Sequence, residues 1–211
     1  MTINLLSALV LGSALLHLGS YAQGLRRAVY LFKPLTIILI ILVAAVAENQ
    51  VSHFYKYAIM AGLVFSLAGD IFLMLPRDCF IQGLVSFLLA HLCYIAAFTF
   101  EARAAERRLL YAVPFLLYGG VMLRVLLPGL GRMRAPVVVY MLVIMLMAWQ
   151  ALNRWTGTGQ EGSGLACSGA LLFVVSDSIL ALNRFKRPFP AAQTYVMSTY
   201  FMAQWLIALS A

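Results

Sequence analysis

Two aspartates inside apolar stretches are the residues of this sequence best suited to chemistry. Asp70 stands in the run GDIFL (69–73) and Asp177 in the similar run SDSIL (176–180), each about six residues before its apolar segment ends. An ionised carboxylate in hydrocarbon costs roughly 3 kcal/mol on insertion scales, so such residues are rare unless they are paired or functional. Two carboxylates at matching positions predict an acid–base site. Bonds to nearby hydroxyls, such as Ser66 or Ser176, would instead make the pair structural.

His91 is a third candidate, because it also lies in a long apolar run. Steps of four, four and three residues place it on one helical face with Gly83, Phe87 and Tyr94. This spacing fits a proton carrier and a hydrogen-bonded interior histidine equally well. A second polar stripe at helical spacing suits either substrate contact or hydrogen bonding between helices. It consists of Gln193, Met197, Tyr200 and Gln204.

The composition places these residues in a membrane protein. Of the 211 residues, 64% are hydrophobic and 10% are charged, whereas soluble domains carry about 25% charged residues. A net charge of +8 would suggest a nucleic-acid partner for a soluble domain. Here Lys and Arg lie in short loops between apolar segments, which is the pattern that sets membrane topology, so we expect no nucleic-acid partner. Cys79, Cys93 and Cys167 show no spacing typical of a disulfide framework or a metal site.

About eight segments are long enough to cross a bilayer, which takes about 20 apolar residues. The second segment is short, and Pro34 would suit its first turn. The residues PRDC (76–79) form a four-residue turn between the third and fourth segments. The sequence therefore predicts an all-α polytopic membrane bundle, as a single integral membrane domain over residues 1–211. The segments are 3–20, 33–47, 54–75, 80–100, 109–127, 135–152, 164–182 and 190–210.

The distribution of Lys and Arg predicts the orientation. Ten of the 15 lie in or beside connections 1–2, 3–4, 5–6 and 7–8, and five lie by the other three connections. By the positive-inside rule, the first set of connections is cytoplasmic and both termini are outside. The five cations of the second set are Lys56, Arg103, Arg107, Arg108 and Arg154.

This topology places both aspartates about 9 Å inside the inner edge of the apolar core, because each helical residue rises about 1.5 Å. His91 would lie nearer the midplane. We therefore expect Asp70, Asp177, His91 and the face from Tyr200 to Gln204 to line one cavity that opens to the cytoplasmic leaflet. Some of the cations at that end would only snorkel to the interface. The polar residues predicted at the cytoplasmic end are Lys33, Arg124, Tyr140, Asn183 and Arg184.

An internal duplication would explain the matching aspartates. Asp70 and Asp177 are 107 positions apart, and Pro34 and Pro136, each near the start of a segment, are 102 positions apart. Four helices followed by four more would form two parallel halves, related by an axis along the membrane normal. The two aspartates would then face each other across this axis.

The pattern of polar residues along nearly the whole chain resembles the YhhN family. The resemblance implies an eight-span membrane protein of the bacterial inner membrane. Characterised members of that family are lysoplasmalogenases, which hydrolyse the vinyl ether bond of lysoplasmalogens to a fatty aldehyde and a glycerophospho-ethanolamine or -choline. The matching residues are Lys33-Pro34, the run GDIFLML (69–75), Gly83-Leu84 with Phe87, His91 and Tyr94, Ser176-Asp177-Ser178 with Asn183, and Ser198-Thr199-Tyr200 with Gln204.

The chemistry of the aspartates suits that reaction. Vinyl ether hydrolysis needs an acid that protonates the β carbon, and an anion that stabilises the resulting oxocarbenium-like cation and activates water. Two carboxylates in unequal environments can divide these roles, as they do in glycoside hydrolysis. The sequence leaves open which aspartate is the acid, and His91 would relay protons or orient one of them. We expect the lysophospholipid to be contacted by Lys33, Tyr94, Tyr140, Ser176, Asn183, Arg184, Tyr200 and Gln204.

Two other classes of protein fit parts of the pattern. Parallel four-helix halves with paired aspartates also describe a small proton- or sodium-coupled carrier. A zinc hydrolase needs three or four clustered ligands, and a chain with three histidines, of which His53 lies in an outer loop, suits it poorly. The sequence indicates no cofactor and no metal, and its expected partners are the lysophospholipid substrate and the surrounding membrane lipids.

Overall fold

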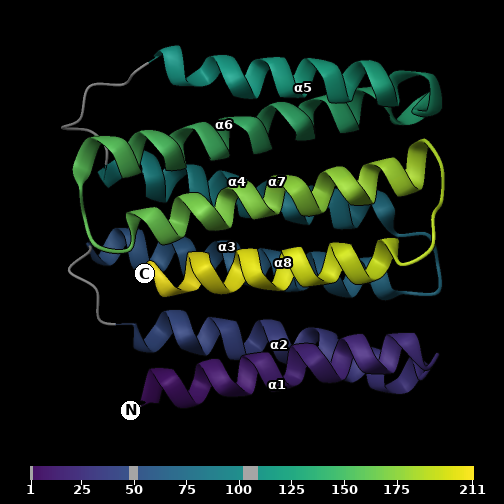
Figure 1. The fold of residues 1–211 in the computed structure, drawn as a ribbon, viewed down its shortest axis with the longest axis horizontal. Coiled ribbons are helices and arrows are strands. Elements are labelled where there is room, and N and C mark those ends of the chain that lie inside the picture. Colours follow the sequence, from purple (N-terminus) through teal and green to yellow (C-terminus); the bar gives the residue numbers. More distant parts are fainter. Residues whose placement is uncertain (1, 48–51, 102–108) are drawn as a thin grey trace.

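The computed structural model describes residues 2–47, 52–101 and 109–211, which form eight α-helices and three short 3₁₀ turns (Figure 1). The predicted all-α architecture is confirmed. The helices are α1 (Thr2–Ala22), α2 (Arg26–Val46), α3 (His53–Met74), α4 (Phe80–Glu101), α5 (Val113–Leu126), α6 (Arg134–Thr158), α7 (Ser163–Phe185) and α8 (Ala192–Leu209), and the 3₁₀ turns are Leu109–Ala112, Leu127–Gly129 and Gly131–Met133.

Seven helical stretches of the described residues are long and apolar enough to cross a membrane. They run from α1 to α7, with the 3₁₀ turns before and after α5 included. The protein is thus an integral membrane protein. The eighth helix, α8, has 18 residues and includes Gln193, Thr194 and Gln204. It lies alongside α7 within the bundle rather than apart from it (Figure 1).

The second segment is longer than the sequence pattern suggests. Helix α2 begins at Arg26, so Pro34 lies inside the helix and not in its first turn. The prediction was wrong because Lys33 ended the apolar run, yet Lys33 is only 5% exposed and lies within the helical bundle. Helix α6 also extends to Thr158, where Gly159 ends it in the left-handed conformation with φ 61°.

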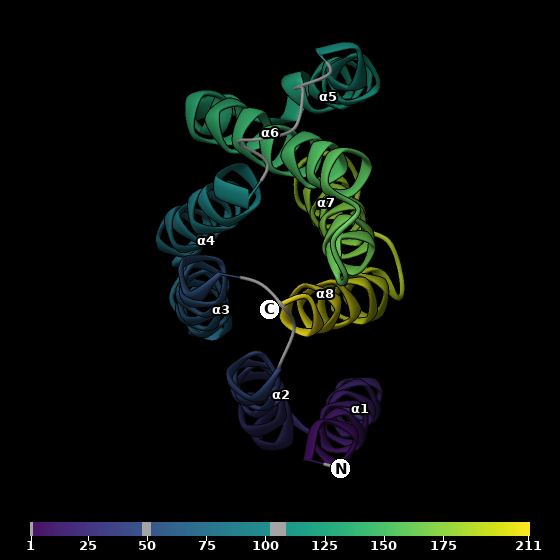
Figure 2. The same cartoon turned by 90° about the vertical axis from the view of Figure 1, so that its left-hand side faces the viewer.

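Six helices form a ring around the centre of the bundle, and α1 and α5 lie outside this ring on opposite sides (Figure 2). Around the ring, α2 packs against α3, α3 against α4, α4 against α6, α6 against α7, α7 against α8, and α8 against α2. Helix α1 covers α2, and α5 covers α6. The ring therefore reads the same when α2, α3 and α4 are exchanged for α6, α7 and α8, as a duplicated four-helix unit would require.

The positions of key residues support this duplication. Lys33 and Tyr140 are 107 positions apart, as are Asp70 and Asp177. The same offset relates Gly62 to Gly169, and each of these two glycines lets the next helix approach closely. A Cβ atom on Gly169 would lie 2.7 Å from the backbone oxygen of Ala203 on α8, and one on Gly62 would collide with the ring of Tyr94 on α4. The pair Pro34 and Pro136 does not follow this offset, because the two prolines are 102 positions apart. Pro34 lies in the interior of α2, whereas Pro136 lies in the first turn of α6.

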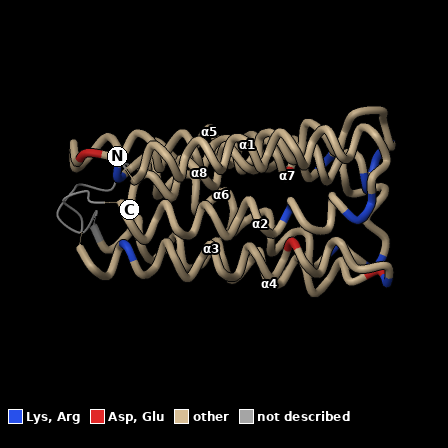
Figure 3. The backbone as a smooth tube through the Cα atoms, turned by 90° about the horizontal axis from the view of Figure 1, so that it is seen from below, with Lys and Arg blue, Asp and Glu red and all other residues tan. Residues whose placement is uncertain are grey.

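Charged residues gather at the two ends of the bundle (Figure 3). Lys and Arg concentrate at the end that carries the connections α1–α2, α3–α4, α5–α6 and α7–α8, which we call the basic end. The chain termini lie at the opposite end (Figure 1). Three of the five cations assigned to that opposite end, Arg103, Arg107 and Arg108, lie outside the described residues.

Candidate active site

A large cavity enters the bundle from the basic end. Its volume is about 1060 Å³, and its walls come from α1, α2, α3, α4, α7 and α8. Exposed Gly24, Pro76 and Pro188 of three basic-end connections line its mouth, and Asp70 and Asp177 line its interior. The structure therefore brings the two predicted carboxylates to one cavity from the pseudo-equivalent helices α3 and α7.

Asp70 is held by a cation and a hydroxyl. The ammonium Nζ of Lys33 lies 2.9 Å from its Oδ1, and the Tyr200 hydroxyl donates a hydrogen bond of 2.7 Å to its Oδ2. The side chains of Lys33 and Asp70 are only 6% and 2% exposed. Lys33 therefore does not snorkel to the interface. It is a buried counter-ion of Asp70 and also lines the cavity, so its predicted contact with substrate stays a prediction.

Asp177 is held without a Lys or Arg partner among the described residues. The Tyr140 hydroxyl donates a short hydrogen bond to its Oδ2, and the Nε2 of His91 lies 3.0 Å from that hydroxyl and 3.8 Å from the same carboxylate oxygen. Because the single Tyr140 proton is given to Asp177, the Nε2 of His91 must be the donor to Tyr140. The Asp177 side chain is 19% exposed, so it is accessible where Asp70 is enclosed.

An aromatic cluster joins the two carboxylate sites. Phe173 packs edge-on against His91, Tyr200 and Phe87, with ring centroids 4.7, 5.4 and 6.2 Å apart. Phe87 in turn meets Tyr200 at 5.8 Å. Gly69 on α3 leaves room for the Phe87 ring, since a Cβ there would lie 2.7 Å from it. Of these rings, Phe87 and Tyr200 border the large cavity, and Phe173 is fully buried behind them.

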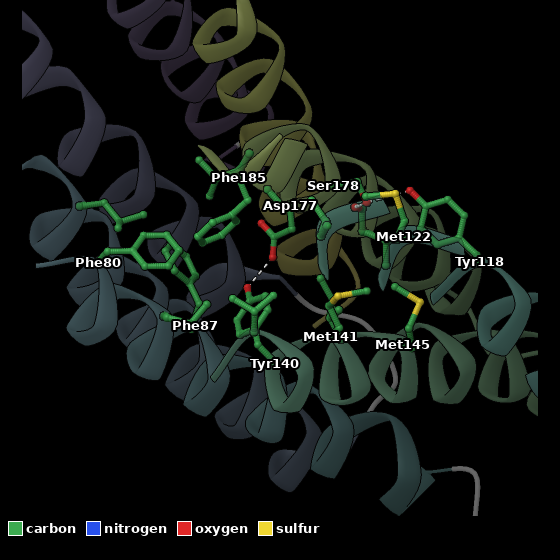
Figure 4. A pocket seen from close by; sticks show the side chains of 18 residues that line it. Phe80, Phe87, Tyr118, Met122, Tyr140, Met141, Met145, Asp177, Ser178 and Phe185 are labelled. Carbon is green, nitrogen blue, oxygen red and sulfur yellow. Dashed lines mark hydrogen bonds between the residues drawn. The ribbon is translucent and has the colours of Figure 1, made fainter. Parts of the chain in front are cut away.

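A second, apolar pocket lies on the other side of Asp177 (Figure 4). Its volume is about 60 Å³, and it is lined by α4, α5, α6 and α7, with Leu73 of α3. Asp177 and Phe87 border both this pocket and the large cavity, whereas Tyr140 borders the apolar pocket only. Figure 4 shows the Asp177–Tyr140 bond between phenylalanines on one side and the methionines Met122, Met141 and Met145 on the other.

The other predicted site residues fall into two groups. Ser176, Asn183, Arg184 and Tyr200 line the large cavity together with Lys33. His91, Tyr94 and Gln204 are fully buried behind the wall rather than on it. The Tyr94 hydroxyl donates a hydrogen bond of 2.7 Å to the Oε1 of Gln204.

Hydrogen bonds within the protein hold several of the lining residues. The Ser176 hydroxyl donates to the backbone oxygen of Val196 at 3.0 Å, and the Oδ1 of Asn183 accepts from the backbone N–H of Phe189 at 3.1 Å. The Nη2 of Arg184 lies 2.9 Å from the Oδ2 of exposed Asp78. Arg184 therefore lines the cavity while its guanidinium pairs with an exposed carboxylate, that of Asp78.

His17 of α1 lines the same cavity, and sequence reasoning passed over it. The side chain is 1% exposed, and neither ring nitrogen makes a hydrogen bond within the described residues, although the backbone of Val29 lies beside the ring. The spacing of polar residues in the sequence did single out this position. His17 shares a buried face of α1 with Ser13 and Ser20, at steps of four and three residues.

Within the ranges that the structure describes, no group of three His, Cys, Asp or Glu side chains is arranged to hold a metal ion.

The fold and the cavity define an integral membrane protein with an intramembrane pair of carboxylates. The chain belongs to the YhhN family, whose model matches residues 28–211. It is 39% identical over 158 residues to human lysoplasmalogenase TMEM86A, and 38% identical over 157 residues to human lysoplasmalogenase TMEM86B. These matches cover 72% and 74% of this chain.

The chain spans 64% of the length of both human relatives. It is also 28% identical over 202 residues to the uncharacterised membrane protein YhhN of Escherichia coli O157:H7, a match that covers 94% of each chain. No solved structure matches this protein.

Proposed function

We propose that this protein hydrolyses the vinyl ether bond of lysoplasmalogens, releasing a fatty aldehyde and a glycerophospho-ethanolamine or -choline. The observation that carries the proposal is Asp177, an accessible carboxylate between a polar cavity and an apolar pocket. The bond to be cleaved lies at the junction of headgroup and chain in such a lipid. The names of the human relatives support the choice of substrate.

The reaction begins with a proton. An acid transfers it to the β carbon of the vinyl ether, and the electron pair of the double bond forms the new C–H bond. This leaves an oxocarbenium-like cation, which water captures with loss of one proton to a base. The resulting hemiacetal collapses to aldehyde and alcohol, so that one water is consumed overall.

Asp177 is the group that we assign to proton transfer. It borders both compartments, and its neighbours are a hydroxyl and an imidazole, so no fixed cation holds it as a carboxylate. After it has given its proton, the same carboxylate is positioned to take a proton from the attacking water, as in glycoside hydrolysis.

Asp70 provides the fixed member of the pair. Its ion pair with Lys33 and its bond from Tyr200 suit the carboxylate form. It lines the same cavity as Asp177, and a preorganised carboxylate there lowers the barrier to a developing cation without reorganisation. The ring of Phe87, which borders the cavity, adds to this stabilisation.

His91 acts through Tyr140 and is a positioning residue. It is fully buried, and its Nε2–H fixes the direction in which the Tyr140 hydroxyl points at Asp177. A histidine that only fills space would leave the pH profile of turnover unchanged when replaced, whereas a positioning histidine shifts that profile.

The headgroup occupies the large cavity. Arg26 and Arg184 line it, and their charges suit a phosphate near the mouth. Deeper in the cavity, the unpaired nitrogens of His17 suit a hydroxyl of the glycerol unit.

The basic end is proposed to face the cytoplasm of a bacterial inner membrane, with both termini outside, and the chain to form one domain over 1–211. Ten of 15 cations support this orientation. Reporter fusions after Arg187 should then report the cytoplasm, and fusions at Ala211 should report the outside. A cytoplasmic C-terminus would invert the assignment.

The alternative of an ion-coupled carrier gains no support from the relatives reported above. Asp70 already holds an ammonium group in the place where a carrier would bind its coupling ion. The test that separates the two uses protein purified in detergent, with lysoplasmalogen as substrate and the ester-linked lysophospholipid as control. The proposed enzyme releases aldehyde from the former and no fatty acid from the latter, and it does so without a sealed compartment. No aldehyde from well-folded protein would refute the proposed function.

A further inference from the structure

The apolar pocket beside Asp177 adjoins a groove on the outside of the bundle. This groove, of about 600 Å³, lies between α5 and α6 and begins at Met141 and Met145, which border the pocket as well. None of its lining residues is charged. The side chains of Met141 and Met145 thus lie between the pocket beside Asp177 and the groove between α5 and α6, and the lining on both sides of them is mainly apolar.

Helix α5 leaves this groove open because it packs loosely. It has few contacts with α6 and α7, and it lies outside the ring of six helices (Figure 2). Gly119 and Gly120 line the groove. A Cβ on Gly119 would lie 3.4 Å from the Cγ of Met145, and one on Gly120 would meet nothing within 4 Å. The methionines at the inner end can adapt to a flexible chain.

The length of the pocket and the groove together matches a lipid chain. From Tyr140, which holds Asp177, to Trp149 at the far end of the groove, α6 rises about 14 Å at 1.5 Å per residue. One leaflet contributes about half of a hydrocarbon core that is about 30 Å thick. The pocket and the groove also run from the basic end toward the opposite end, which is the direction of a chain whose headgroup lies at the basic end.

We propose that the α5–α6 groove holds the alkyl chain of the lipid while its ether bond lies at Asp177, and that Gly119 and Gly120 set the chain length accepted. This rests on the proposed function. The large cavity carries the charged side chains Arg26, Lys33 and Arg184, whereas no charged residue lines the groove, so the cavity suits the headgroup and the groove suits the chain. In this proposal, the lipid enters the α5–α6 groove laterally from the membrane, past α5.

The test replaces Gly120 by leucine. Wild type and Gly120→Leu are compared on two lysoplasmalogens, one with a chain of leaflet length and one with half that length. The kcat/KM ratio of long over short should fall by roughly tenfold, the scale on which a small change in an apolar pocket discriminates. The matched control is Gly12→Leu on α1, another exposed helical glycine whose Cβ would meet nothing within 4 Å. It should leave the ratio unchanged.

A second variant guards against misfolding of the first. Leu116 also lines the groove, is 65% exposed and has little packing to lose, so Leu116→Trp should lower the same ratio. An unchanged ratio in a folded variant of either kind would overturn this proposal and leave the proposed function standing. A wild type that turns over neither lipid would refute the proposed function instead.

Discussion

The two halves of the bundle place a carboxylate at the same position and treat it differently. Asp70 receives an ammonium from its own half, Lys33 on α2, and a hydroxyl from the other half, Tyr200 on α8. Asp177 receives a hydroxyl from its own half, Tyr140 on α6, and an imidazole from the other half, His91 on α4. The offset that relates Asp70 to Asp177 also relates Lys33 to Tyr140.

This difference shows how two pseudo-equivalent halves can surround equivalent carboxylates differently. The offset of 107 residues relates the two carboxylates and also their partners Lys33 and Tyr140, and the proposed division of labour rests on this one exchange. With lysine, the carboxylate has a fixed counter-ion and is enclosed. With tyrosine, it keeps a neutral partner and stays accessible. The peripheral helices differ in parallel, because α1 borders the polar cavity, whereas α5 borders the apolar pocket and groove.

The largest expected effect comes from removing either carboxyl group. Asparagine keeps the size of aspartate but neither donates an acidic proton nor carries charge, so Asp177→Asn and Asp70→Asn should each lower turnover by about 10²–10⁴-fold. The double variant should be little worse, because residues that act as one unit are not additive. Aldehyde release per folded molecule measures this. Near-normal turnover in both single variants would make the pair structural.

The next largest effect should be on thermal stability, which Asp70→Asn and Asp177→Asn should change by different amounts. Lys33→Met and Asp70→Asn each leave a buried charge without its partner, which costs about 3–5 kcal/mol. The double variant Lys33→Met/Asp70→Asn should recover most of that loss in thermal unfolding but none of the turnover. Asp177→Asn breaks no Lys or Arg pair within the described residues and should unfold near the wild-type temperature. Equal destabilisation by Asp70→Asn and Asp177→Asn would contradict the comparison.

The smallest effect should come from the two tyrosine hydroxyls. A hydrogen bond to a charged group is worth about 1.5–3 kcal/mol, and each 1.4 kcal/mol is about tenfold in rate. Tyr140→Phe should therefore lower kcat by roughly ten- to a hundredfold and also shift the pH profile, because it disconnects His91 from Asp177. Tyr200→Phe should cost less, since Lys33 still holds Asp70. The reverse order would assign the acid to Asp70.

Much of this arrangement follows from the sequence, because long apolar runs and isolated aspartates are visible without a fold. The depth of Lys33 is not visible, since a lysine at the edge of an apolar run usually marks the interface. Only its distance to Asp70 shows that it is a partner, and this also explains the misplaced start of α2. The spacing of His17 with Ser13 and Ser20 marks a polar face of α1, but it does not show that this face lines the cavity of the two aspartates. The apolar pocket depends on side chains from five helices, and the spacing of residues along the chain does not show that these helices meet.

The most direct measurement of the central claim follows the proton. Purified protein hydrolyses lysoplasmalogen in D₂O, the aldehyde is trapped at once, and the mass of the trapped product is measured by mass spectrometry. Unlabelled aldehyde, incubated and trapped in the same way, corrects for exchange. Wild type should place one deuterium on the carbon next to the carbonyl, because that carbon receives the proton of the acid, and Asp177→Asn should form this product at least a hundredfold more slowly. Aldehyde without deuterium, or labelled aldehyde from Asp177→Asn at the wild-type rate, would contradict the account.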